Sequence, residues 1–206
     1  MRVTVILYNG DDETECEINW ALAYQKANTV KDSHIVKIFP LPPNGPTPPI
    51  LGLTYLLEEQ DDAIDTLIIS AHGAADKFDI ASGDPSSDSF GVVGGDYSNV
   101  TPYEFGHKIG PYMKNNGVLW LLTCNTMDND NNHTGYISQS IADKAECTVY
   151  AFSGALRVDG DNETASYSTF VSPDHMLYES TSTSTTAHFF ANYHNEYPEM
   201  HFHSDL

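Results

Sequence analysis

A histidine and a cysteine each follow a strongly apolar run of the chain. TLIIS at 66–70 leads into Ala-His72-Gly, and VLWLL at 118–122 leads into Thr-Cys124. In an open parallel sheet, reacting groups gather beyond the carboxyl ends of the strands, so neighbouring strands would bring this imidazole and this thiol to one cleft. An imidazole beside a thiol can accept its proton and later protonate a leaving amine. The pattern predicts nucleophilic catalysis by Cys124, with His72 as general base.

Gly73 comes directly after the imidazole and has no side chain. Its backbone N–H can therefore approach a developing oxyanion, together with the amide of Cys124. A single cysteine at a strand end is most often a small buried apolar residue, and a single His-Gly pair most often forms a turn. Their joint occurrence, each after its own apolar run, favours a catalytic pair.

Five short apolar runs, rich in β-branched and aromatic residues, predict strands that are buried on both faces. They lie at 3–8, 34–39, 66–70, 118–122 and 148–152. The segments between them predict helices at 17–27, 50–60, 101–114 and 134–145. Strands that alternate with helices form right-handed crossovers, so we expect an α/β fold: a three-layer αβα sandwich with a mostly parallel sheet. Residues 76–100 interrupt the alternation and predict a small hairpin excursion.

The runs LIISAHG, VLWLLTCNT and GYISQSIADKAECTVYAFSG together resemble the caspase-like cysteine peptidases of clan CD. In motif style they are closest to CHAT-type and toxin self-processing protease domains. The resemblance covers residues 1–155 and implies a caspase-like catalytic core with His72 as general base, Cys124 as nucleophile and Gly73 at the oxyanion site. Residues 156–206 would form a polar extension, containing histidines and aromatic residues, packed on this core. The residues around Cys124 differ from the caspase signature, so caspase specificity for Asp is not expected.

The resemblance also implies where substrate specificity arises. Family members build the pocket from the end of the first strand and from the loop after the last core strand. Asp11 and Asp12 follow the first strand, and Asp159 and Asp161 follow the last. Carboxylates at the bottom of a pocket would pair with Arg or Lys, so we expect cleavage after a basic residue. The chain has 29 acidic residues, so an acid near any chosen point is common, and small or apolar pockets stay open as alternatives.

The balance of 9 basic against 29 acidic residues, a net charge of −20, repels phosphate groups. We therefore expect neither nucleic acid nor membrane as a partner, and favour a cationic peptide or protein. The sequence contains no signal-peptide core and no membrane-spanning run, which predicts a cytoplasmic protein, or an effector delivered by a route not visible in the sequence. Three cysteines, Cys16, Cys124 and Cys147, argue against a disulfide framework.

Two other groups of polar residues could bind metals. DNDNNHTG at 128–135 is similar to a calcium-binding loop but has His133 at the sixth position and Gln139 at the twelfth. Four histidines near the C-terminus could hold zinc or nickel, yet the aromatic residues between them favour packing on the body. These histidines are His188, His194, His201 and His203. We expect no metal and no cofactor.

The leading hypothesis is a cysteine endopeptidase with a Cys-His dyad. It would act on a peptide or protein substrate and would depend on an activating partner or ligand, as clan members commonly do. Two alternatives remain. One is a caspase-like binding or regulatory module without turnover, and the other is a Cys-dependent acyltransferase, because a Cys-His pair does not by itself define the acceptor.

Overall fold

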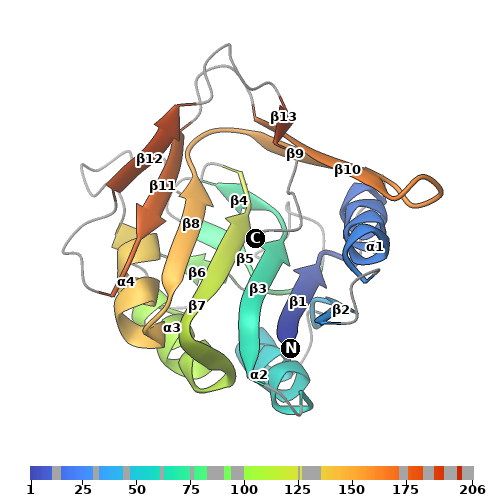
Figure 1. Ribbon diagram of the computed structural model, residues 1–206. Helices are drawn as coiled ribbons and strands as arrows, with labels where there is room; N and C mark the ends of the chain where they lie inside the picture. Colours follow the sequence, from blue (N-terminus) through green and yellow to red (C-terminus); the bar gives the residue numbers. More distant parts are fainter. Residues whose placement is uncertain are drawn as a thin grey trace.

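A seven-stranded sheet forms the centre of the molecule (Figure 1). The computed structural model describes residues 1–10, 15–29, 33–43, 47–60, 63–74, 77–82, 91–93, 100–124, 126, 136–171, 176–182, 188–192 and 199–200. The strand order among these residues is β12-β11-β8-β7-β3-β1-β2. The strands are β1 (Arg2–Tyr8), β2 (His34–Pro40), β3 (Ile64–Ser70), β7 (Met113–Leu122), β8 (Thr148–Phe152), β11 (Met176–Ser180) and β12 (His188–Asn192).

The five strands predicted from the sequence are the parallel part of this sheet. β2, β1, β3, β7 and β8 pair in parallel, and β11 and β12 add two antiparallel strands at one edge. The predicted α/β fold with a mostly parallel sheet is confirmed. The sequence predicted a boundary at residue 155 between the core and the C-terminal extension. β8 ends before this boundary and pairs with β11, which lies after it.

The described helices are α1 (Cys16–Asn28), α2 (Pro49–Glu58), α3 (Pro102–Ile109) and α4 (Tyr136–Ala145). The prediction of one helix over 101–114 was wrong at its C-terminal end. The α-helix stops at Ile109, a 3-10 turn, η1, covers Gly110–Tyr112, and β7 begins at Met113. Pro111 has no backbone N–H to continue the helix, and its ring clashes with the preceding turn.

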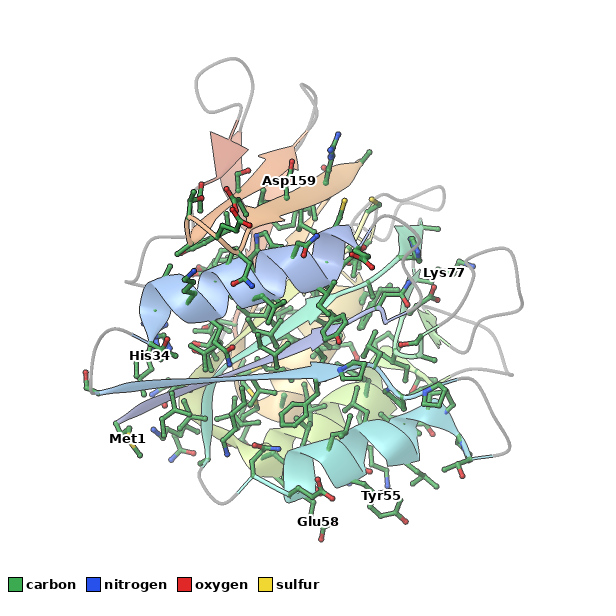
Figure 2. All side chains as sticks on the ribbon, turned by 90° about the vertical axis from the view of Figure 1, so that its right-hand side faces the viewer. Met1, His34, Tyr55, Glu58, Lys77 and Asp159 are labelled. Atoms are coloured by element: carbon green, nitrogen blue, oxygen red, sulfur yellow. The ribbon has the colours of Figure 1, made fainter. Side chains whose placement is uncertain are left out.

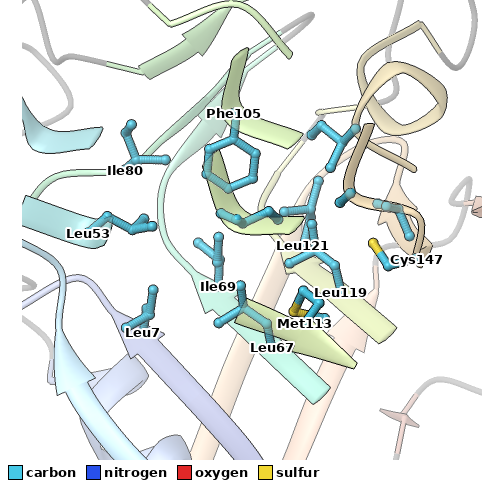
Figure 3. Packing of buried hydrophobic residues seen from close by; sticks show 14 of the residues in the cluster. Leu7, Leu53, Leu67, Ile69, Ile80, Phe105, Met113, Leu119, Leu121 and Cys147 are labelled. Atoms are coloured by element: carbon cyan, nitrogen blue, oxygen red, sulfur yellow. The ribbon is translucent and has the colours of Figure 1, made fainter. Parts of the chain in front are cut away.

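Helices cover both faces of the sheet. On one face, Leu53 of α2, Phe105 of α3 and Ile141 of α4 pack in one buried cluster with Leu67 and Ile69 of β3 (Figure 3). On the other face, a second cluster joins α1 to the strands through Trp20, Tyr24, Ile6, Ile68 and Trp120. Successive strand residues point to opposite faces, so a strand covered on both sides needs apolar residues at nearly every position.

A small antiparallel sheet packs on the outer side of α1, so this helix is buried between two sheets (Figures 1 and 2). Its strands are β9 (Leu156–Asp161), β10 (Ser166–Val171) and β13 (Glu199–Met200), in the order β13-β10-β9. A Cβ atom at Gly160 would lie 2.5 Å from the Cα of Trp20. Only glycine permits this approach of β9 to α1.

The excursion after His72 forms a second small antiparallel sheet. It consists of β4 (Gly73–Ala74), β5 (Lys77–Asp79) and β6 (Gly91–Val93). Residues 83–90 and 94–99 of the predicted hairpin excursion lie outside the described residues. Among the helices described, none combines the length and the apolarity that crossing a bilayer requires.

Candidate functional site

The two strands that precede His72 and Cys124 are neighbours in the sheet. β3 and β7 run parallel with Ser70 opposite Leu122, and the N–H of Ala71 donates to the carbonyl of Leu122 at 3.4 Å. His72 and Cys124 each come two residues after this pair. The condition that the sequence left open, that these strands lie side by side, is therefore met.

Gly73 lies directly against the backbone of Cys124. A Cβ atom at Gly73 would overlap the carbonyl oxygen of Cys124 and would lie 3.0 Å from its amide nitrogen. Any side chain here would push the two strand ends apart. The turn after β7 is held by a hydrogen bond between the hydroxyls of Thr123 and Thr126, both of which are buried.

The thiol of Cys124 is held by the first residue of β9. Its Sγ lies 3.2 Å from the carbonyl oxygen of Leu156, to which it donates, and 3.2 Å from the Leu156 nitrogen, from which it accepts. A carbonyl acceptor requires the protonated thiol, whereas an N–H donor stabilises the thiolate. In the described part of the chain, no hydrogen bond joins His72 to Cys124. Catalytic hydrogen bonds of this kind often form only when substrate is bound.

His72 and Cys124 line one cavity of about 440 Å³. The other walls come from Cys16 and Glu17 at the start of α1, from the ends of β3 and β7, and from residues 156–158 of β9. Leu122 and Val158 belong to the buried cluster that contains α1, so the cavity lies on the α1 face of the sheet. A volume of this size lies within the range of small-ligand sites.

The acidic residues that the sequence predicted for the substrate pocket lie elsewhere or outside the described residues. Asp159 lies 3.7 Å from Arg157 in an exposed pair. Asp161 caps the β9–β10 turn, where hydrogen bonds from Thr164 and from the N–H of Glu163 hold the pKa of its carboxyl below the usual range. Neither side chain lines the cavity. Asp11 and Asp12 are outside the described residues.

Sequence reasoning named only His72 and Cys124 among the residues that line the cavity and missed, among others, Cys16, Glu17, Ser70 and Arg157. Two of them had a detectable signal. The helix after β1 must begin at the carboxyl end of the sheet, so Glu17 starts close to the strand ends. Ser70 is the last residue of β3 and precedes His72 by two residues, at the same end of the sheet. The cavity wall formed by Arg157 had no such signal, because it depends on how β9 packs on α1.

No group of three or more His, Cys, Asp or Glu side chains in the described ranges is arranged to hold a metal ion. The loop at 128–135, three of the four tail histidines (His194, His201 and His203) and the side chain of His188 are outside what the structure describes.

Comparison of the chain with protein-family models, with curated proteins and with solved structures finds no match.

Proposed function

We propose that this protein is a caspase-like cysteine endopeptidase that cleaves after a basic residue, with Cys124 as nucleophile and His72 as general base. One observation carries the proposal: an imidazole and a thiol, at the carboxyl ends of two adjacent parallel strands, line the same cavity. Active sites in open α/β sheets occupy this position.

The proposed reaction has two steps. Sγ of Cys124 attacks the peptide carbonyl carbon while His72 takes the thiol proton, and the same proton then goes to the departing amine, leaving a thioester on Cys124. A water molecule, deprotonated by His72, attacks the thioester and releases the acid and the free thiol. The N–H groups of Gly73 and Cys124 are the expected donors to the oxyanion, which the close packing of their backbones supports.

The bonds to Leu156 fit the expected need for an activating partner or ligand. While Sγ donates to the Leu156 carbonyl, its proton is engaged by this carbonyl and not by His72. Attack requires the thiol to leave this acceptor, so a shift of the first residue of β9 would release the nucleophile. A substrate or partner that moves Leu156 would thereby activate the protein.

The test is labelling of the intact protein with peptidyl acyloxymethyl ketones that carry Arg, Lys, Asp or Leu next to the reactive group, followed by mass mapping. We expect labelling of Cys124, fastest with Arg or Lys, and a fall in rate of about 100-fold or more in His72→Ala. Cys16 lines the same cavity and is the internal control, so Cys16→Ala should leave the labelling of Cys124 unchanged.

A binding or regulatory module without turnover is the second candidate. The two hydrogen bonds between Cys124 and Leu156 favour it, because they engage the thiol in a structural role. Slow labelling of Cys16 and Cys124 at similar rates, unaffected by His72→Ala, would reject the peptidase and support this alternative.

A further inference from the structure

The hydroxyl of Ser70 is a buried polar group at the wall of the cavity. Ser70 is 1% exposed, and its Oγ has no hydrogen-bond partner among the described residues. Leaving a buried hydroxyl unpaired destabilises the folded protein. Because Ser70 lines the cavity, a bound ligand can supply the missing partner.

The alternation of β3 sets the direction of this hydroxyl. Ile69 packs in the cluster with α2, α3 and α4, whereas Ile68 packs in the cluster with α1. Ser70 lies two residues after Ile68, so its side chain points to the α1 face. The cavity is on that face, with Leu122, the register partner of Ser70, in its wall.

Glu17 brings a negative charge to the same cavity. It lies in the first turn of α1, and its Oε2 is buried. Arg157 also lines the cavity, but its side chain is 70% exposed and Asp159 lies 3.7 Å away. Water and this partner weaken the field of Arg157, whereas the carboxylate of Glu17, one oxygen of which is buried, acts in a medium of lower dielectric constant. The cavity therefore favours a cation.

Apolar residues complete the lining of the cavity. They are Ala71, Leu122, Leu156 and Val158. Such walls suit the methylene groups of a long basic side chain, whose charged end requires polar partners.

We propose that this cavity receives the Lys or Arg side chain that precedes the cleaved bond, with Glu17 pairing with the charged group and Ser70 accepting a hydrogen bond from it. The inference rests on the proposed peptidase function and names its specificity residues. It assigns to Glu17 and Ser70 the role that the sequence analysis predicted for Asp159 and Asp161.

The test measures binding without chemistry. Cys124→Ala protein is titrated by NMR with acetyl-Ala-Ala-Lys-amide, and with the same peptide carrying norleucine or Glu in place of Lys. We expect the Lys peptide to bind about tenfold more tightly than the norleucine peptide, and the Glu peptide to bind most weakly. Adding Glu17→Gln should remove the preference for Lys, and adding Ser70→Ala should reduce it by about threefold.

Glu58→Gln is the matched control. Glu58 is exposed at the end of α2, on the opposite face of the sheet, and the substitution removes the same charge (Figure 2). It should leave the ratio of affinities unchanged. Ser70→Ala should unfold at a temperature no lower than its parent, because it deletes an unpaired buried group.

Equal affinities for Lys and norleucine, absence of binding, or a Lys preference that survives Glu17→Gln would overturn the pocket assignment. His72-dependent labelling of Cys124 would still support the peptidase in those cases. The converse result, Lys-selective binding without His72-dependent labelling, would reject the peptidase and keep the pocket.

Discussion

The three cysteines form no disulfide and lie in two kinds of environment. Cys16 and Cys124 are partly exposed and line the cavity, whereas Cys147 is 2% exposed in the cluster beneath α2, α3 and α4. Burial raises the pKa of the Cys147 thiol to about 12. A thiolate is the reactive form, so Cys147 should react far more slowly than an exposed thiol.

Cys147 should resist iodoacetamide at pH 8 while the protein is folded, and react once it is unfolded. Its raised pKa also makes stability depend on pH. The contribution is complete below the unfolded pKa of about 8.5 and falls as the pH rises toward 12. The wild type should therefore lose about 2 kcal/mol relative to Cys147→Ala between pH 8 and pH 10.5, measured by urea unfolding. A constant difference would contradict the burial of this thiol.

Asp65 stabilises the end of the sheet opposite the cavity. Its Oδ2 accepts from the Nζ of Lys114 at 2.6 Å and from the N–H of Val3 at 2.7 Å. Burial alone would raise the pKa of this carboxyl, but the two hydrogen bonds outweigh it and hold the pKa below the usual value. The ionised form is thus favoured by folding.

Asp65→Asn should lower the free energy of unfolding by about 1 kcal/mol at pH 7, because the pair with Lys114 is partly exposed. A lowered pKa contributes stability above the unfolded value of about 3.9 and loses it as the pH falls through the folded value. The difference from wild type should shrink below about pH 4 in urea titrations. A cost that stayed the same at pH 3 would show that the ionised carboxylate is not responsible.

At the scale of elements, the cavity depends on how β9 packs on α1. Leu156, Arg157 and Val158 form one wall, and Gly160 allows the strand to approach Trp20 closely. The Nζ of Lys26 in α1 donates to the carbonyl oxygens of Asn162 and Glu163 in the turn after β9. Tyr167 of β10 packs edge-on against the Trp20 ring, with centroids 5.9 Å apart.

Gly160→Ala should destabilise the protein by about 1–3 kcal/mol, because the new methyl group overlaps the backbone of Asn19 and Trp20. It should also displace Leu156 and increase the reactivity of Cys124 toward small thiol reagents. Thermal unfolding and iodoacetamide kinetics measure the two effects. Asn162→Ala, at the exposed turn of the same hairpin, is the control and should change stability by less than about 0.5 kcal/mol. Wild-type stability in Gly160→Ala would disprove the close approach.

The whole molecule carries 29 acidic residues and only 9 basic ones. Repulsion within a compact body of this charge opposes folding and is screened by salt. Raising NaCl from about 10 mM to about 300 mM should therefore raise the midpoint of thermal unfolding, as measured by circular dichroism. A midpoint that stayed constant or fell would mean that local ion pairs outweigh the overall repulsion.

Local pattern was sufficient to predict the parallel strands and the positions of His72 and Cys124 at the ends of two of them. β1, β3 and the second half of β7 are largely buried, so their sequences are mostly apolar and stand out against the helices between them. His72 and Cys124 come directly after two of these strands, which makes their position readable from neighbouring residues alone.

The strands after residue 155 had no such signal. The cavity wall that β9 forms could therefore not be predicted either. β9 and β10 pack on the outer side of a helix, and β11 and β12 lie at the edge of the sheet, where polar residues such as Glu179 are tolerated.

The residues at the ends of the core strands could be predicted from the sequence alone, because strand burial and strand direction are local properties of the chain. Tertiary structure decided which residues surround the thiol. Glu17, Ser70 and Arg157 come from three elements, and only the packing of β9 on α1 and of α1 on the sheet brings them to one cavity. The same packing directs Asp159 and Asp161 away from it, since β9 runs outward along α1 and carries its later residues to an exposed turn.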